Sequence, residues 1–426
     1  MQNLAYVFIY LEGEPKAVPA GEFRYDSVNH IGSFDYGRFY KQRKNALPVD
    51  PVTLPLVGVI QPTAKNDGIY GVFRDASPDY WGRLVIASER RASINAISDF
   101  EYLLATNASR VGNLDFRPKV DSPEPIVSVP AFATLEELMD AARAIEQERK
   151  VPAKIRALLA QGTSIGGARP KCVVERSDGL WIAKFPAKGD DFSAGRVEYA
   201  ALTLAKRAGI QVPAVEVMEI GGRDVLLVSR FDRKKTKNGY TRQGFISALT
   251  LMDSDEQDIT WGYPDMAARM RELGVGDKNS LCELYRRMIY NICCRNEDDH
   301  ARNHGFLMVG AKLVLSPAYD ILPRPAIPGV SSDFQLALRV GEGGRAATLE
   351  NALTSHAQFG LAENEARHIV DEVARVTSQW AAHFKKCGVR EKDIRKFAGS
   401  FERAQSWRKS PGLGKAQRKR GSLAQE

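Results

Sequence analysis

The chain has few cysteines and no long hydrophobic run. Its 426 residues include five cysteines with no CxxC pair, namely Cys172, Cys282, Cys293, Cys294 and Cys387. An odd, unpaired set fits a reducing compartment and argues against a thiolate zinc site. No apolar run approaches the roughly 20 residues that cross a bilayer, and no basic segment precedes the first apolar stretch, Tyr6 to Leu11. We therefore expect a cytoplasmic protein that makes no membrane contact.

Basic residues outnumber acidic ones, but the excess lies in one region of the chain. The formal net charge is +8, and Arg403 to Arg420 contains seven Lys or Arg and no acid. The rest of the chain is therefore close to neutral. A basic tail of this kind is typical of contacts with nucleic acid or an acidic partner, and equally of a solvated tail that only aids solubility.

The composition is that of an ordinary globular protein, with 44% hydrophobic and 26% charged residues. The length predicts two or three domains, because a single core rarely grows beyond about 250–300 residues. We expect a mixed α/β segment at 1–120, a β-rich segment at 121–245 and a mostly helical segment at 246–426. A polar connector separates the first two and contains Pro118, Pro123, Pro125 and Pro130.

Strand signals are clearest in the middle segment. The run Ser177-Asp-Gly predicts a tight turn that joins strands at 171–175 and 180–185 into a hairpin. Two more strands are expected at 214–219 and 225–228, because both runs are apolar and a Gly-Gly pair separates them.

Helix signals occur on both sides of these strands. The run Asp75-Ala-Ser-Pro-Asp-Tyr-Trp-Gly-Arg predicts the start of a capped helix, and Thr134 is expected to cap another. Val197 to Ala208 has one apolar stripe and precedes Gly209, as expected for a helix with a glycine after its last turn. The wide apolar face of Leu281 to Ile292 predicts a buried central helix.

The most informative stretch follows that central helix and reads Asn296-Glu-Asp-Asp-His-Ala-Arg-Asn303. Asp298 and Asn303 have the spacing that protein-kinase catalytic loops use between the catalytic base and a metal ligand. Asp320 ends a later strand-like run and is a second candidate metal ligand. These three groups are the minimum needed to hold Mg²⁺-nucleotide and to orient an attacking hydroxyl. Taken alone, the stretch is also compatible with a solvated acidic turn after a helix.

Residues upstream supply the other parts of a nucleotide site. Gly166 and Gly167 could bring backbone N–H groups close to phosphate oxygens, although paired glycines usually mark only a turn. The run matches neither the Walker A nor the GxGxxGxV pattern. Lys184 lies in an apolar strand, where it needs a partner such as Glu198 unless both are simply exposed. Residues 229–232 follow an apolar strand, as a hinge that presents backbone groups to adenine would do.

The order of these motifs resembles the HipA family of toxin kinases from bacterial toxin–antitoxin modules. With Val111-Gly-Asn-Leu-Asp-Phe, the runs that carry the resemblance are Ser164-Ile-Gly-Gly-Ala-Arg-Pro-Lys, Trp181-Ile-Ala-Lys-Phe-Pro, Val228-Ser-Arg-Phe-Asp-Arg, Asn296-Glu-Asp-Asp-His-Ala-Arg-Asn and Leu315-Ser-Pro-Ala-Tyr-Asp-Ile. They span nearly the whole chain. The resemblance implies an α+β, two-lobed protein-kinase-like fold with an extra N-terminal α/β subdomain and a mostly helical C-terminal lobe. Two departures from general protein kinases, no Arg directly before Asp298 and Tyr-Asp-Ile in place of Asp-Phe-Gly, are usual in this family.

The resemblance also implies roles for the reacting groups. Asp298 is expected to be the catalytic base, and Asn303 and Asp320 are expected to bind Mg²⁺. Ser164 falls at the serine that the family phosphorylates on itself to inhibit activity. Its neighbour Thr163 is an alternative phosphoacceptor.

Further roles concern the nucleotide. Lys184 is expected to bind ATP phosphates and to act in catalysis, with Glu198 as its ion-pair partner. Ser229 and Phe231 are expected to offer backbone contacts to adenine, and Asp232 to approach the ribose. The full set of expected ATP contacts is Gly166, Gly167, Lys171, Lys184, Ser229, Phe231, Asp232 and His300.

The implied activity is that of a serine/threonine protein kinase that uses ATP and Mg²⁺ and acts as a growth-slowing toxin. The implied protein substrate is a translation protein such as an aminoacyl-tRNA synthetase. No helix-turn-helix is evident in this chain, so the implied HipB-like antitoxin, through which the complex would bind operator DNA, should be a separate protein. Two alternatives stay open, a small-molecule phosphotransferase of the same superfamily and a non-catalytic, DNA-associated scaffold. The presence of Lys184, Asp298, Asn303 and Asp320 favours an enzyme.

Overall fold

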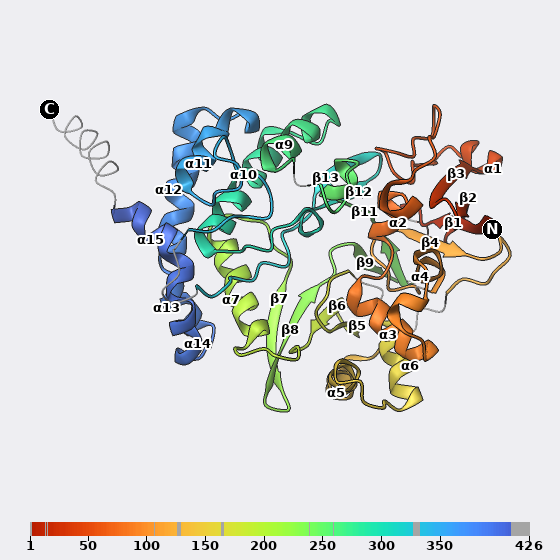
Figure 1. The fold of residues 1–426 in the computed structure, drawn as a ribbon, viewed down its shortest axis with the longest axis horizontal. Coiled ribbons are helices and arrows are strands. Elements are labelled where there is room, and N and C mark those ends of the chain that lie inside the picture. Colours follow the sequence, from red (N-terminus) through yellow and green to blue (C-terminus); the bar gives the residue numbers. More distant parts are fainter. Residues whose placement is uncertain are drawn as a thin grey trace. The chain divides into compact units, whose positions relative to one another are not determined.

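The computed structural model describes residues 2–409 except positions 13, 15, 106, 126–128, 163–165, 238, 259 and 327–332. The chain forms two compact units, each built from separate stretches of sequence. The first comprises Met1–Arg196, Pro213–Asp258 and Ala301–Pro317, and the second comprises Val197–Val212, Ile259–His300 and Ala318–Glu426. All strands that the structure describes belong to the first unit, whereas the second is helical (Figure 1).

The N-terminal part of the first unit is an antiparallel sheet covered by aromatic side chains. The strand order is β3-β2-β1-β4, with β1 Gln2–Ile9, β2 Val18–Asp26, β3 Ile31–Tyr36 and β4 Leu114–Arg117. Phe23 of β2 packs edge-on against Phe73, with ring centroids 5.1 Å apart, and Phe73 packs against Phe116 at 4.9 Å. The helices of this part are α1 Arg38–Lys41, α2 Gly71–Asp75, α3 Tyr80–Arg90 and α4 Asp99–Ala105.

A second antiparallel sheet has the order β5-β6-β8-β7. Its strands are β5 Lys171–Arg176, β6 Gly179–Lys184, β7 Val215–Ile220 and β8 Arg223–Ser229. The predicted hairpin is confirmed, because β5 and β6 pair from Lys171 opposite Lys184 to Arg176 opposite Gly179. Helices α5 Leu135–Glu146 and α6 Ala153–Gln161 share a buried core with this sheet, in which Trp81 of α3 also lies.

A three-stranded sheet completes the first unit, with β11 Gly244–Ser247, β12 Gly305–Val309 and β13 Lys312–Leu315. Before β11 the chain forms a two-stranded ribbon, with β9 Arg233–Thr236 and β10 Gly239–Arg242. After β11 it forms helix α8 Ala248–Leu251. Because β12 pairs with β11, residues 301–317 fold with the first unit although helices of the second unit precede them in sequence. The three consecutive domains expected from the sequence stay a prediction.

The second unit is built around the buried helix α10. As predicted, its apolar face is buried, and α10 contacts α9, α11, α12 and α15. The residues of this face are Leu281, Leu284, Tyr285, Met288, Ile289 and Ile292. The helices of this unit are α7 Ala194–Arg207 (its first residues lie in the other unit), α9 Tyr263–Glu272, α10 Lys278–Cys294, α11 Leu349–Thr354, α12 Glu363–Thr377, α13 Trp380–Lys386, α14 Glu391–Lys396 and α15 Glu402–Lys409. Within the described residues, no helix combines the length and the apolar character that a membrane span requires.

Helix boundaries confirm two predictions in full and a third in part. Asp79 caps α3, since its Oδ1 accepts a hydrogen bond from the Tyr80 N–H at 2.9 Å, and Gly209 after α7 has a φ of +83°. Thr134 occupies the N-cap position of α5, as predicted, but its side chain makes no capping hydrogen bond. Its hydroxyl donates to the carbonyl of Ala131 at 2.7 Å, because Thr134 ends a short 3-10 turn and does not have the extended backbone of a capping residue.

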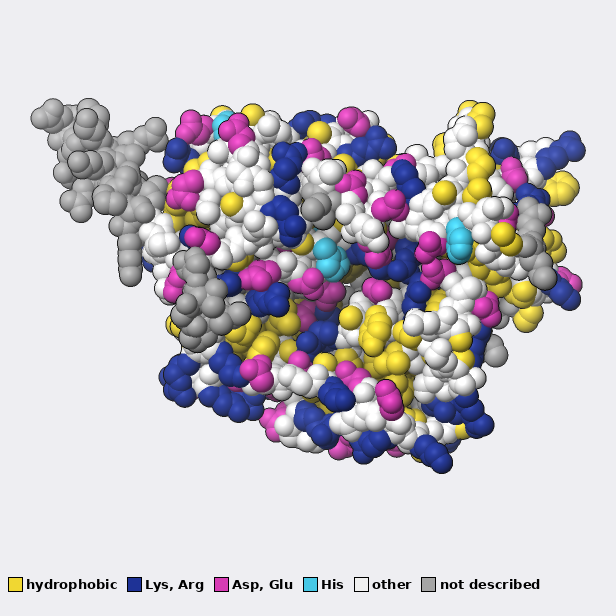
Figure 2. All heavy atoms as spheres, viewed as in Figure 1, with side chains coloured by type: hydrophobic (Ala, Val, Ile, Leu, Met, Phe, Trp, Pro, Cys, Tyr) yellow, Lys and Arg dark blue, Asp and Glu magenta, His cyan; other side chains and the backbone are white. Residues whose placement is uncertain are grey.

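Lys and Arg side chains are interspersed with Asp and Glu over the face shown in Figure 2. This mixture agrees with the near-neutral balance outside Arg403 to Arg420. The part of the basic tail from residue 410 onward lies outside the described residues.

Candidate functional site

Two lysines face each other on the β5–β6 hairpin. Lys171 and Lys184 are direct partners across the antiparallel pair, so both side chains point to the same face. Lys171 is only 4% exposed, and its Nζ donates to the carbonyl of Gly166 at 2.8 Å. Like charges directly opposite each other repel, and an anion bound by both reduces this repulsion. The arrangement therefore suits a bound phosphate, the group that the sequence assigned to both lysines.

One residue of the glycine pair, Gly167, has a backbone that only glycine adopts easily. Gly167 has a φ of +101°, and a Cβ there would lie 2.3 Å from the Lys171 Nζ. The Gly167 N–H donates to Asp79 Oδ2 at 3.0 Å, so this amide is already used and a phosphate would be bound by other groups, such as the two lysines. The phosphoacceptor candidates Ser164 and Thr163 lie outside the described residues.

The predicted hinge begins at the end of β8. The Ser229 N–H donates to the carbonyl of Ala214 at 2.9 Å, so an adenine contact from Ser229 would have to use its carbonyl. Phe231 follows in a turn and is partly buried. Both adenine contacts stay predictions.

Asp232 has a different environment from the one that a ribose contact suggests. It is 4% exposed, and its carboxylate accepts from Arg230 Nη2 at 2.7 Å, Arg233 Nη1 at 2.8 Å and the Gly112 N–H at 3.0 Å. Burial favours the neutral acid, but the two guanidinium groups outweigh it and lower the pKa of Asp232 far below its usual value. A ribose hydroxyl would have to share oxygens that already hold this buried ion pair.

The loop with the predicted base belongs to the second unit. Arg295 follows the last residue of helix α10 and has a φ of +54°, and this left-handed residue turns the chain out of the helix. Asn296 is then anchored to the helix, since its N–H and Nδ2 donate to Asn291 O and Oδ1 at 3.0 and 3.1 Å. The Asp298 side chain is 84% exposed, and His300 Nε2 lies 3.8 Å from its Oδ1. A carboxylate on a fixed loop and open to solvent is accessible to a substrate hydroxyl.

The sequence reading missed the neighbour, Asp299. It is 1% exposed, and its Oδ2 and Oδ1 accept from the Tyr263 hydroxyl at 2.8 Å and the Ala337 N–H at 2.6 Å. Asn291 Nδ2 donates to the same Tyr263 oxygen at 2.9 Å, so a buried chain of hydrogen bonds fixes the loop from beneath. Burial raises the pKa of Asp299 to about 7. The pair of adjacent aspartates was the only signal, and it does not say which one is buried.

The predicted metal ligands supply oxygens, the donors that Mg²⁺ prefers. Asn303 ends a 3-10 turn, and Asp320 is partly buried with a φ of +53°, a strained backbone that often occurs at functional sites. This donor set fits the ion. Asn303 and Lys184 lie in the first unit, whereas Asp298, Asp320 and Glu198 lie in the second. The shared metal ion and the Lys184–Glu198 pair therefore stay predictions.

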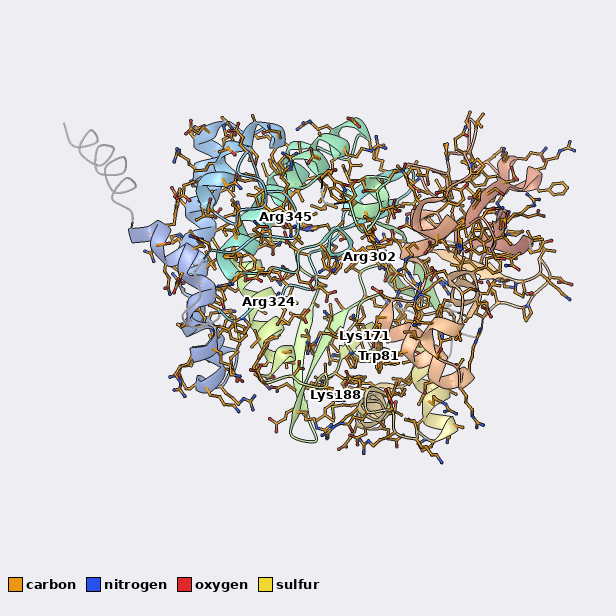
Figure 3. The ribbon with its side chains drawn as sticks, viewed as in Figure 1. Trp81, Lys171, Lys188, Arg302, Arg324 and Arg345 are labelled. Carbon is orange, nitrogen blue, oxygen red and sulfur yellow. The ribbon has the colours of Figure 1, made fainter. Side chains whose placement is uncertain are left out.

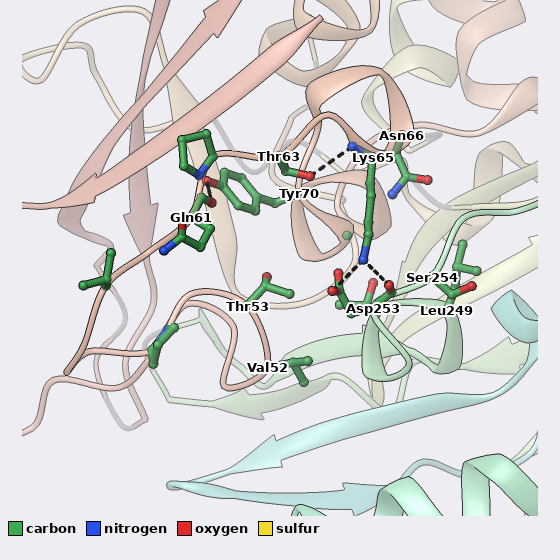
Figure 4. Close-up of a pocket in the computed structure, with 15 residues that line it drawn as sticks. Val52, Thr53, Gln61, Thr63, Lys65, Asn66, Tyr70, Leu249, Asp253 and Ser254 are labelled. Carbon is green, nitrogen blue, oxygen red and sulfur yellow. Dashed lines mark hydrogen bonds and ion pairs between the residues drawn. The ribbon is translucent and has the colours of Figure 1, made fainter.

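A cavity of about 370 Å³ lies elsewhere in the first unit and contains none of the predicted site residues (Figure 4). It is lined by residues from 52–71 and 249–254. Lys65 joins the two stretches, because its Nζ donates to the carbonyl and to Oδ2 of Asp253, both at 2.6 Å. The Tyr70 hydroxyl likewise donates to the carbonyl of Gln61 at 2.8 Å. These polar groups of the cavity lining therefore bind one another.

Comparisons with known proteins identify the family of this chain. A family model described as the HipA-like C-terminal domain matches residues 163–380, just over half of the 426 residues. The chain belongs to the HipA-like family. A Sinorhizobium fredii protein named "Putative kinase Y4mE" is 25% identical over 353 residues, which are 76% of this chain and 78% of that protein. A Haemophilus influenzae protein named "Putative kinase" is 25% identical over 200 residues, which are 42% of this chain and 57% of the relative.

A solved structure shows the same fold as this HipA-like chain. It is the complex of HipA, HipB and operator DNA from Shewanella oneidensis MR-1, one chain of which matches with a TM-score of 0.65 and 17% identity. The match covers 94% of this chain and 96% of that chain. It confirms the α+β, kinase-like fold class that the sequence predicted.

Proposed function

We propose that this HipA-like protein is an ATP- and Mg²⁺-dependent serine/threonine protein kinase. The observation that supports this most is the facing pair Lys171 and Lys184 next to the glycine pair at 166–167. This pair of cationic side chains suits the phosphates of a nucleotide. The names of the two relatives given above are in line with a kinase.

In this proposal the residues act mainly by positioning and by neutralising charge. Lys184 and Lys171 bind phosphate oxygens, and Asn303 and Asp320 hold Mg²⁺, which would neutralise charge on the phosphates when bound. Asp298 accepts the proton of the attacking hydroxyl, and the buried Asp299 network keeps its loop in place.

The biological role in this proposal is that of the toxin in a toxin–antitoxin module. The Shewanella oneidensis complex contains HipA, HipB and operator DNA, which supports a small antitoxin partner for this chain, through which it would bind DNA. We propose a helix-turn-helix antitoxin. The proposed substrates are an aminoacyl-tRNA synthetase or another translation protein, and the kinase itself at Ser164.

Phosphate transfer by the purified protein tests the activity. With radiolabelled ATP and Mg²⁺, we expect label in protein, both in the kinase itself and in a translation extract. Label that appears only in metabolites would favour the small-molecule phosphotransferase. No ATP turnover under any of these conditions would favour the non-catalytic scaffold.

A further inference from the structure

Residues at the start of α3 form hydrogen bonds to both ends of the segment 167–171. The Trp81 indole N–H donates to the carbonyl of Lys171 at 2.8 Å, and the Trp81 backbone N–H lies 3.4 Å from the carbonyl of Gly167. Two residues earlier, at the N-cap position of α3, Asp79 accepts from the Gly167 N–H at 3.0 Å. Trp81 is 1% exposed and belongs to a core that includes residues of β5 and β6. It lies close to Lys171 (Figure 3). Three hydrogen bonds from one helix start thus fix both ends of residues 167–171.

Asp79 also binds the residue next to the predicted metal ligand. Its Oδ2, the oxygen that accepts from Gly167, lies 3.3 Å from Arg302 Nη1, and Arg302 directly precedes Asn303. The same guanidinium nitrogen is 3.0 Å from Glu256 Oε1. All of these residues belong to the first unit. The Asp79 carboxylate therefore connects α3, the glycine pair and the turn that contains Arg302 and Asn303.

The charge state of Asp79 suits this role. Burial favours the neutral acid, but Arg302 and the N–H groups of Gly167 and Tyr80 outweigh it and lower the pKa of Asp79. The carboxylate is consequently an anion at neutral pH, and hydrogen bonds to an ionised acceptor are stronger than neutral ones.

We propose that Asp79 is a positioning residue, which holds the glycine pair and the Arg302–Asn303 turn in the arrangement that binds nucleotide. This inference rests on the proposed kinase function for its consequence, although the contacts themselves do not depend on it. Asp79 lies in the N-terminal subdomain, so that subdomain takes part directly in building the nucleotide site.

Two substitutions separate the parts of this role. Asp79→Asn keeps an oxygen for the Gly167 N–H but removes the charge that attracts Arg302, whereas Asp79→Ala removes both. Ser98→Ala is the matched control, because the Ser98 hydroxyl accepts from the Glu101 N–H at 3.3 Å and caps α4 in the same subdomain without a contact to the glycine pair. The control reproduces the loss of a helix cap alone.

Hydrogen exchange of the free protein is the first measurement. We expect peptides that cover residues 166–171 to exchange faster in Asp79→Ala than in Asp79→Asn, and to be unchanged in Ser98→Ala. This readout needs no kinase activity, so it decides the positioning role even if the proposed function fails. Unchanged exchange in Asp79→Ala would overturn the proposal.

Kinetics give the second measurement. Because Asp79 touches no reacting atom, we expect the KM for ATP to rise about tenfold in Asp79→Asn while kcat stays nearly constant. In an Arg302→Gln background the same substitution should change the KM much less, since the partner is already lost. A KM that falls, or equal effects in both backgrounds, would contradict the role. If the unmodified protein transfers no phosphate at all, the proposed function fails and the exchange result still stands.

Discussion

Asp298 and Asp299 are adjacent in sequence but have opposite environments. The side chain of Asp298 is 84% exposed, whereas Asp299 is 1% exposed and accepts two hydrogen bonds inside the second unit. The kinase-like spacing to Asn303 was enough to select Asp298 from the sequence. Nothing in the sequence identified Asp299, because an irregular loop has no periodicity that would indicate which side chains point inward.

The exposed aspartate should be needed for chemistry but not for nucleotide binding. We expect Asp298→Asn to lower phosphoryl transfer by about 10²–10⁴-fold, the usual loss when a positioned base is removed. Nucleotide affinity, measured by fluorescence titration, should change little. Glu297→Gln in the same loop serves as the control. Near-normal transfer by Asp298→Asn would exclude Asp298 as the base.

The buried aspartate should make stability depend on pH. Its folded pKa is about 7 and its ordinary value 3.8, so between these values the folded state binds more protons than the unfolded state. The free energy of unfolding should therefore fall as pH rises through this window, by up to about 1.4 kcal/mol for each pH unit. Urea denaturation gives the free energy of unfolding at each pH. Between pH 4 and pH 7 this free energy should fall more steeply for the unmodified protein than for Asp299→Asn. Burial also raises the pKa of Asp50, to about 6. Its effect on stability is present in both proteins and therefore cancels in the difference between them. Parallel curves would show that Asp299 is not the group responsible.

At the scale of elements, short-range signals predicted the β-sheet that carries the lysines. A two-residue turn fixes the register of a hairpin, and Ser177-Asp-Gly thereby set Lys171 opposite Lys184. Thr134 shows the limit of such signals, since a 3-10 turn before α5 uses its hydroxyl in another hydrogen bond. Long-range partners were also missed. Asp232 is bound by the Gly112 N–H, a residue far away in sequence, and the chain order contains no sign of this contact.

Asp232 should therefore be more important for stability than for ribose binding. Asp232→Asn would leave the buried Arg230 and Arg233 without a counter-charge, and we expect a loss of about 3–5 kcal/mol in the free energy of unfolding. Because its pKa is lowered, the contribution of Asp232 is present at neutral pH and is lost as pH falls. Asp140→Asn removes an exposed ion pair with Arg223 and should cost less than about 1 kcal/mol. An Asp232→Asn protein of normal stability with weak ATP binding would instead indicate a ribose contact.

At the scale of the whole molecule, each compact unit is built from separate stretches of the chain. Residues 301–317 fold with strands of the first unit, and 197–212 fold with helices of the second. The predicted base and one predicted metal ligand, Asp298 and Asn303, are thus neighbours in sequence but members of different units. A sequence pattern records such neighbours well, but it contains no information on which strand the chain pairs with next, because strand pairing over long separations depends on the packed core.

Phosphorylation of Ser164 should control the activity of the whole enzyme. We expect the kinase to phosphorylate itself there and thereby to lose activity. A phosphate group would add nearly two negative charges next to the glycine pair. These charges would repel the phosphates of ATP and would offer Lys171 and Lys184 a competing partner. Mass spectrometry of the unmodified protein and of Asp298→Asn should show phosphate on Ser164 only in the former, and Ser164→Ala should stay active for longer in the presence of ATP. Phosphate on Thr163 alone would move the switch by one residue, whereas a phosphorylated Ser164 with full ATP binding and transfer would refute it.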